Sequence, residues 1–263
     1  MTINNRDVYQ ILRKGITGGL SNVGHRLNIK GETHINKLIY KDGKVESIDT
    51  DNIMTHFCGI DFNSLYPSSF SSQKNENIPY TNGTMYMPGY LKNYYEVGEY
   101  FTINDAMKII KSKDTLFIAE IKAHIPEKYI NEFINFLPIF RRIEITTNKE
   151  TIGDYMYNYL EKNNLSKDVK ETKLTQLAEV KEFTAFSSYY LWFLMDRCHL
   201  VIDDIQSISV WSKHKGFNKF VNRFMQNRIK AMEENNKGVE QFCKTTLNGS
   251  YGYDGKNTEK YNK

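Results

Sequence analysis

Asp61 begins the run Asp-Phe-Asn-Ser-Leu-Tyr-Pro, and the apolar stretch 57–60 comes directly before it. That stretch predicts a buried strand over residues 57–61. Metal-dependent phosphoryl transfer needs a carboxylate at the end of such a strand, followed by a turn that exposes backbone N–H groups. The carboxylate can then hold Mg²⁺ while the turn faces a triphosphate. The run therefore predicts a metal ligand at Asp61.

A second segment with chemical potential, Lys-Thr-Thr-Leu-Asn-Gly-Ser-Tyr-Gly, covers residues 244–252. On a helix, Lys244, Asn248 and Tyr251 recur at i, i+4 and i+7 and share one stripe. An ammonium group can neutralise phosphate, an amide can form hydrogen bonds and a phenol ring can stack on a base. Taken alone, the pattern favours an ordinary amphipathic surface helix with an incidental lysine. The apolar back of this helix is predicted to carry Val239, Phe242 and Thr246, with Cys243 and Leu247 between the two faces.

The composition sets limits but names no function. The 263 residues suffice for one large domain or two small ones, and 40% apolar with 25% charged residues is ordinary for a globular protein. A net charge of +4 permits nucleic-acid binding without demanding it. No apolar run reaches the length of a membrane span, so no membrane association is expected. The three cysteines form no C-x-x-C pair, and we expect buried thiols rather than a zinc site or disulfides: Cys58, Cys198 and Cys243.

The pattern of the chain predicts an α+β fold, in which helices and strands are mixed. Asp42-Gly43 predicts a β-hairpin between strands 35–40 and 45–48. Further strands are predicted at 115–124 and 201–210, and 163–173 is expected to be an exposed linker. Helices are predicted at 6–14, 104–112, 151–162 and 183–200, and a final pair is separated by a break at 235–238.

The two motifs resemble a known family when they are taken together. Asp61-x-x-Ser64-Leu65-Tyr66-Pro67 resembles motif A of the family B DNA polymerases, and Lys244-x-x-x-Asn248-Gly249-x-Tyr251-Gly252 resembles their motif B, in the family's order. Upstream, Gly18-Gly19 resembles the Gly-Gly element of protein-primed members from bacteriophages, linear plasmids and related viruses. Two positions depart from the pattern. Gly249 replaces a serine of motif B, and Ile16 replaces the aromatic residue of the Gly-Gly element.

The resemblance implies a division of the chain, because most of its length separates the two motifs and protein-primed polymerases carry an insertion there. Residues 1–56 would be a linker and β-hairpin leading into the palm, and 57–89 a palm segment with motif A. Residues 90–200 would be an insertion that contacts the terminal protein and DNA, and 201–263 a palm strand and the fingers helices with motif B. The implied fold is a partial polymerase palm with an inserted subdomain and fingers helices. Arg141 and Arg142 of the insertion suit either phosphate contact or a solvated face.

The resemblance also implies roles for individual residues. Asp61 would hold Mg²⁺ with help from the Phe62 carbonyl, in a site of two metal ions. Ser64 and Leu65 would offer backbone N–H groups to the triphosphate. Tyr66 would pack under the incoming sugar and exclude a 2′-hydroxyl group.

Motif B and the Gly-Gly element would complete the substrate contacts. Lys244 would bind the triphosphate, and Asn248 and Tyr251 would line the new base pair. Lys230 on the preceding helix is a second candidate for the triphosphate, with a spacing to Lys244 that is slightly stretched. Three glycines would approach DNA: Gly18, Gly19 and Gly252. The implied partners are a DNA primer–template, deoxynucleoside triphosphates (dNTPs) and a terminal protein, inside a cell or organelle that the sequence leaves open.

The second metal-binding carboxylate of the family lies in motif C, downstream of motif B, and the sequence up to Lys263 does not contain it. We therefore expect the chain alone to bind little metal and to show little or no turnover. The segment Asp49-Thr50-Asp51 resembles motif C but precedes motif A, and a turn is the better interpretation. The alternatives are a non-catalytic remnant that binds DNA or a terminal protein, and another palm enzyme such as a reverse transcriptase or an RNA polymerase.

Overall fold

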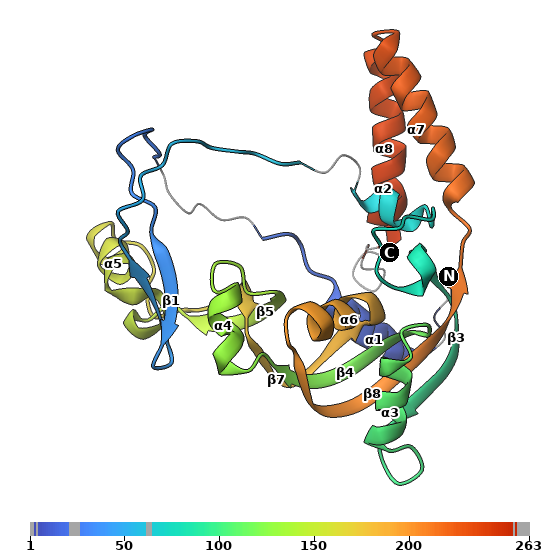
Figure 1. Cartoon of the computed structure of the whole chain (residues 1–263), viewed down its shortest axis with the longest axis horizontal. Coiled ribbons are helices and arrows are strands. Elements are labelled where there is room, and N and C mark those ends of the chain that lie inside the picture. The colour runs from blue at the N-terminus through green and yellow to red at the C-terminus, as the bar shows by residue number, and fades with distance from the viewer. Residues whose placement is uncertain (1–2, 4, 21–26, 62–64, 255, 257–263) are drawn as a thin grey trace.

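The computed structural model of the protein describes residues 3, 5–20, 27–61, 65–254 and 256. The described helices are α1 (Arg6–Gly15), α2 (Leu65–Phe70), the 3-10 turn η1 (Thr81–Gly83), α3 (Ile103–Lys111), α4 (Glu127–Phe133), α5 (Lys149–Lys162), α6 (Ser188–Arg197), α7 (Asn218–Glu233) and α8 (Lys237–Asp254). The described strands are β1 (Lys37–Lys41), β2 (Lys44–Ile48), β3 (Met87–Glu96), β4 (Leu116–His124), β5 (Ile139–Thr146), β6 (Lys170–Leu177), β7 (Glu179–Ser187) and β8 (Val201–His214). All strand pairings in these residues are antiparallel, which confirms the α+β prediction (Figure 1).

One four-stranded sheet, in the order β3-β8-β4-β7, organises the larger part of the molecule (Figure 1). Strand β4 alternates in burial, so that Phe117 and Ile121 face the main core with α3 and α6. On the other face, Leu116 packs with Val8 of α1. The period-2 pattern of β4 therefore places helices on both faces of this sheet.

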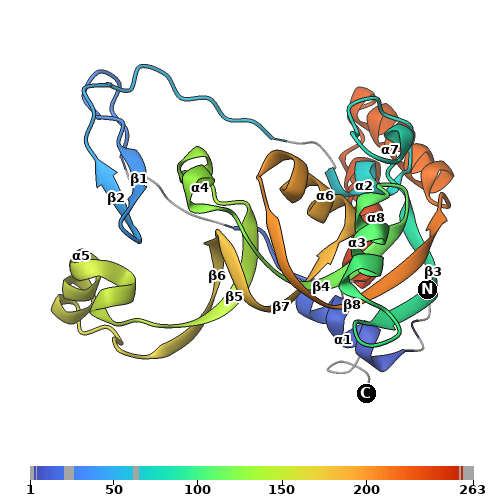
Figure 2. The same cartoon turned by 60° about the horizontal axis from the view of Figure 1, so that its bottom comes forward.

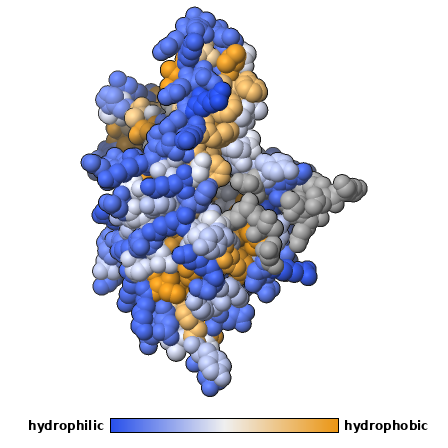
Figure 3. Space-filling model, turned by 90° about the vertical axis from the view of Figure 1, so that its right-hand side faces the viewer, coloured by the Kyte–Doolittle hydropathy of each residue, from blue (hydrophilic) through white to orange (hydrophobic). Residues whose placement is uncertain are grey.

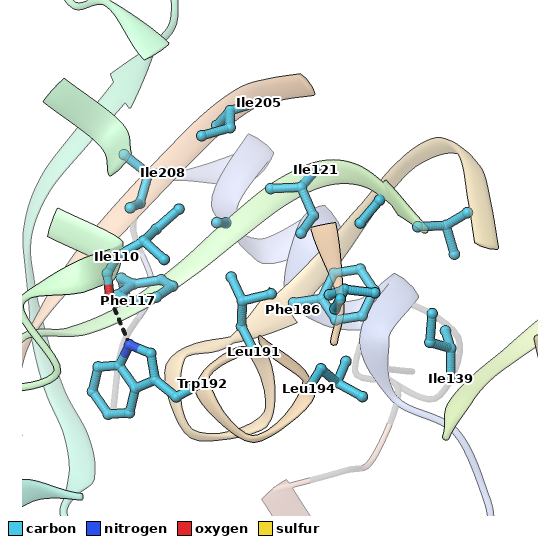
Figure 4. Close-up of a cluster of buried hydrophobic side chains, with 14 of the residues drawn as sticks. Ile110, Phe117, Ile121, Ile139, Phe186, Leu191, Trp192, Leu194, Ile205 and Ile208 are labelled. Atoms are coloured by element: carbon cyan, nitrogen blue, oxygen red, sulfur yellow. Dashed lines mark hydrogen bonds between the residues drawn. The ribbon is translucent and has the colours of Figure 1, made fainter. Parts of the chain in front are cut away.

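Trp192 is a fully buried member of the main core (Figure 4). Its indole Nε1 donates a hydrogen bond of 2.7 Å to the carbonyl of Ile110, which ties α6 to the last turn of α3. The ring contacts Phe117 edge-on at a centroid distance of 5.8 Å. Burial with a satisfied N–H group is what allows a tryptophan to occupy a core.

The prediction of a buried strand over residues 57–61 is wrong. This segment has no ladder partner among the described strands, and it runs as an extended connection (Figure 1). The side chains of Phe57 and Ile60 are 85% and 83% exposed, and Cys58, predicted to be buried, is exposed too. A short apolar run forms a strand only when a neighbour satisfies its backbone groups, and local sequence does not supply that neighbour.

Two further predictions need correction. Residues 183–200 are not one buried helix, because β7 continues to Ser187 before α6 begins. The stretch 163–173 is not all linker, because β6 begins at Lys170 and pairs with β5 along its length. Strand β6 is largely polar, and Lys170 forms an ion pair of 2.9 Å with Glu144 across the two strands. Cross-strand pairing, rather than an apolar face, therefore defines this strand.

The β1–β2 hairpin is confirmed, with Asp42 and Gly43 both at positive φ in its turn. Asn131 of α4 holds the hairpin through two hydrogen bonds with the backbone of Tyr40. In the loop after β2, the Thr50 hydroxyl donates to the carbonyl of Ile35, and Asp49–Asp51 follow β2 in a loop.

The sheet joins strands from segments that the resemblance assigns to different parts of a polymerase. The palm segment supplies only the start of β3, up to residue 89, and the C-terminal segment supplies β8, while the rest of β3 and all of β4 and β7 come from the predicted insertion. The part that leaves this sheet is the β5–β6 pair with α5 (Figure 2). Among the described residues, none of the helices combines the length and the apolar character needed to cross a membrane.

Asp105 stabilises the first turn of α3, and this stabilisation depends on pH. The Thr102 hydroxyl and Asp105 form a reciprocal capping box, and this hydrogen bonding, with help from Lys108, lowers the pKa of Asp105 to about 2. A carboxyl group with a lowered folded-state pKa contributes stability above its unfolded pKa of about 4, and this contribution is lost as the pH falls toward 2. We expect the urea midpoint of Asp105→Asn to depend less on pH between 4 and 2 than that of the unmodified chain. Asp51→Asn, in an exposed loop, should keep the full dependence.

Candidate functional site

Helices α7 and α8 form an antiparallel hairpin that projects from the sheet, with α2 at its base (Figure 1). A small core joins the three helices through Phe70, Val221 and Leu247. The side-chain amide of Gln73, just after α2, donates a hydrogen bond of 2.7 Å to Asn222 of α7. The helix that follows Asp61 is therefore packed on the helix that carries Lys244.

The two motifs meet through a pair of tyrosines. The rings of Tyr66 and Tyr251 stack with centroids 4.6 Å apart and planes inclined by 20°. Tyr66 remains 60% exposed, while Tyr251 is half-buried beside the small core. Stacked rings at this separation attract each other beyond the area that they bury.

The buried face of α8 differs from the predicted one. Val239 and Phe242 are exposed, whereas Cys243 and Leu247 are buried, and Leu247 packs with Val221 of α7. The position of the partner helix therefore decides which line of α8 is buried, and the apolar residues of α8 do not decide it. Hydrophobic side chains consequently reach the surface along the hairpin (Figure 3).

Lys244 and Asn248 are exposed on α8, on the stripe that leads to Tyr251, as their spacing predicts. No ion pair engages Lys244 within the described part of the chain. Lys230 instead forms an i, i+4 pair of 3.7 Å with Glu234 near the tip of α7. The described contacts do not bring Lys230 to Lys244. Gly252 is exposed, and an added Cβ there would meet no atom within 4 Å.

The structure describes only part of the predicted metal site. Asp61 is exposed, and none of the hydrogen bonds or ion pairs of the described residues involves it. Leu65, 53% exposed, begins α2, while Phe62 and Ser64 lie outside the described residues. Within the described ranges, no group of three or more His, Cys, Asp or Glu residues could hold a metal ion. The resemblance implies that this segment supplies one of the two metal-binding carboxylates, so a cluster of ligands is not expected here. Mg²⁺ binding at Asp61 stays a prediction.

The Gly-Gly element and motif A share a pocket of about 550 Å³. Gly18 and Gly19 follow α1 and form part of its wall, and Tyr66 forms another part. Sequence reasoning did not place Arg141 and Tyr190 here, although both line this pocket. One signal could have found Arg141. Successive side chains of a strand point to opposite faces, so a strand at this position places Arg141 and Arg142 on different faces of β5.

No family model, curated protein or solved structure matches this chain. The resemblance therefore rests on the motif residues alone.

The tyrosine stack has a measurable energy. Tyr66→Ala and Tyr251→Ala should each lower the free energy of unfolding, and the double variant should lose less than the sum. We expect a coupling energy of about 0.5–1.5 kcal/mol from a double-mutant cycle in urea. Pairing Tyr66→Ala with Tyr100→Ala, a fully exposed position at 96%, should give additive losses. A coupling near zero for Tyr66 and Tyr251 would show that the stack contributes nothing in solution.

Proposed function

We propose that this chain is the segment from motif A to motif B of a family B DNA polymerase of the protein-primed type. Its parent activity would be templated addition of deoxynucleotides to a primer. The chain alone, with one of the two metal carboxylates, would be inactive.

The observation that carries the proposal is the stack of Tyr66 on Tyr251. In the proposed site, Tyr66 packs under the sugar of the incoming nucleotide and Tyr251 lines its base. One nucleotide can touch both side chains only when they lie side by side, although most of the chain separates them in sequence. A centroid distance of 4.6 Å is compatible with that requirement.

The exposure of two further side chains supports the proposal. The ammonium group of Lys244 is exposed on the stripe that leads to Tyr251 and available to a triphosphate. Asp61 is exposed and has no hydrogen-bond or ion-pair partner among the described residues, so its carboxylate would be open to a metal ion. Bound Mg²⁺ would activate the primer hydroxyl group and stabilise the leaving pyrophosphate. The backbone carbonyl of Phe62 would assist in holding the metal ion. The backbone N–H groups of Ser64 and Leu65 would face the triphosphate.

The proposal extends to macromolecular partners. A DNA primer–template would pass Gly18, Gly19 and Gly252, and residues 90–200 would contact DNA and the terminal protein that acts as first primer. Helix α5, which has no buried residue, lies with the β5–β6 pair outside the main sheet and would be open to such a partner (Figure 2).

Nucleotide binding tests the proposal on the chain as it stands. We expect a fluorescent dNTP to bind residues 1–263, and Lys244→Ala to weaken binding by about tenfold, because a charge-assisted contact to phosphate is lost. Lys230→Ala, whose side chain pairs with Glu234, should weaken it less. Fluorescence anisotropy with unlabelled dATP and ATP as competitors measures both effects. Equal competition by ATP would favour an RNA polymerase, and no binding of any triphosphate would contradict the proposal.

One observation favours a second candidate, a non-catalytic remnant that binds DNA or a terminal protein. The segment before Asp61 is exposed and has no ladder partner among the described strands, so nothing described there fixes the carboxylate. Salt-dependent binding of DNA without binding of any triphosphate would support this candidate.

A further inference from the structure

Arg141 of β5 is half-buried and carries a positive charge without a negative partner among the described residues. One Nη atom donates a hydrogen bond of 2.6 Å to the carbonyl of Phe140, and the other donates a bond of 2.6 Å to the carbonyl of Ala185. The ring of Phe186 lies 4.4 Å from the guanidinium carbon. The Nε atom is buried and has no hydrogen-bond partner. None of the ion pairs among the described residues involves Arg141.

This arrangement leaves the charge incompletely compensated. Burial lowers the pKa of Arg141, yet a guanidinium group stays protonated in proteins. Two carbonyl dipoles and a ring face stabilise the cation in part, but its half-buried position and the buried Nε atom without a partner still leave the charge less well solvated than in water. An anion beside Arg141 would remove this penalty. Glu179 and Glu182 share a second pocket with Arg141, but Glu179 is paired with Lys181, and neither lies within ion-pair distance of the guanidinium.

The pocket of about 550 Å³ beside Arg141 can admit such an anion. Its wall includes the backbone from Gly15 to Leu20, where an added Cβ at Gly18 or Gly19 would meet nothing within 4 Å. The bare backbone of glycine allows a ligand to approach N–H groups closely. Tyr66 and Tyr190 add aromatic walls. Each Nη atom has a second N–H, beyond the one given to a carbonyl, that a ligand oxygen can accept.

We propose that Arg141 and the glycine-rich backbone at Gly18-Gly19 form a phosphate-binding site. The phosphate would be either a phosphodiester of a nucleic-acid strand or the phosphate of a free nucleotide. That it belongs to nucleic acid or nucleotide rests on the proposed function, whereas the anion site itself does not. Arg142, the next residue, is exposed and has no such role, so the structure separates two arginines that the sequence leaves equivalent.

Thermal unfolding of residues 1–263 in pyrophosphate, against sodium chloride of the same ionic strength, tests the anion site. Pyrophosphate should raise the Tm of the unmodified chain and of Arg142→Met, because a ligand that binds the folded state stabilises it. Arg141→Met should lose this shift. Gly18→Val should lose it as well, because its side chain enters the pocket while open space around Gly18 leaves the fold intact. If Arg141→Met does not fold, the Tm shift of Gly18→Val in pyrophosphate tests the site by itself.

A labelled single-stranded oligothymidylate and dATP, each followed by anisotropy or competition, distinguish the two sources. Arg141→Met should weaken binding of the correct source by about tenfold or more, and Arg142→Met by about twofold or less. A pyrophosphate shift that persists in Gly18→Val and Arg141→Met would overturn the site, as would the absence of any shift in the unmodified chain. Oligonucleotide or dATP binding that does not depend on Arg141 would overturn the assignment of either ligand to this site and leave the proposed function standing. An Arg141-dependent pyrophosphate shift without binding of either ligand would leave the site standing and contradict the proposed function.

Discussion

Replacing Asp61 by Asn should lower magnesium-dependent primer extension by at least about a thousandfold. The proposed reaction needs a second metal-binding carboxylate, so the measurement is made on a polypeptide that supplies one in addition to residues 1–263. The amide keeps the shape of the side chain but removes the negative charge that holds Mg²⁺. Loss of metal-based stabilisation of the reacting phosphate costs several kcal/mol, and about 4 kcal/mol corresponds to a thousandfold in rate.

The chain offers a matched control for this experiment. Asp51 lies in the exposed loop after β2, within the segment Asp49-Thr50-Asp51 that resembles a metal motif. Asp51→Asn should leave extension unchanged within about twofold, because the loop contributes to a turn. Residues 1–263 alone should extend no primer. If Asp61→Asn keeps more than a tenth of the activity, or if the loss occurs in Asp51→Asn instead, Asp61 is not the metal ligand.

Replacing Trp192 by Ala should lower the free energy of unfolding by about 3–5 kcal/mol, a large share of the stability of a domain of this size. The side chain is 1% exposed and packs against Tyr80 and Phe117. Its removal leaves a cavity and also leaves the carbonyl of Ile110 without its indole donor. Urea unfolding followed by circular dichroism measures the change.

Trp192→Phe separates packing from hydrogen bonding, because it keeps an aromatic ring and loses the N–H donor. It should cost less than Trp192→Ala, and the remaining loss should reflect the unsatisfied carbonyl and the smaller ring. Tyr100→Ala, at a position that is 96% exposed, should change stability by less than about 0.5 kcal/mol. A loss below about 1.5 kcal/mol for Trp192→Ala would mean that α3 and α6 repack without this contact.

Elements with a strong local signal could be predicted from the sequence. Asp42-Gly43 determines its hairpin because few other residue pairs tolerate positive φ at both turn positions. Helices α7 and α8, separated by the break near Asn235, follow from their apolar spacing and their length. The stretch before Asp61 could not be predicted, because a strand depends on a neighbour that lies elsewhere in the chain.

Of the candidate site, the sequence by itself determined the residue types and their order: a carboxylate at Asp61, a tyrosine at Tyr66, and the stripe of Lys244, Asn248 and Tyr251 on one helix. The tertiary structure alone decided which of them meet. Helix α2 docks at the base of the α7–α8 hairpin and so stacks Tyr66 on Tyr251, and the β5 strand leaves Arg141 half-buried while Arg142 is exposed. The physical reason is the distance along the chain over which each property is determined. Side-chain chemistry and helical spacing are local properties, whereas burial and stacking depend on packing between segments far apart in the chain.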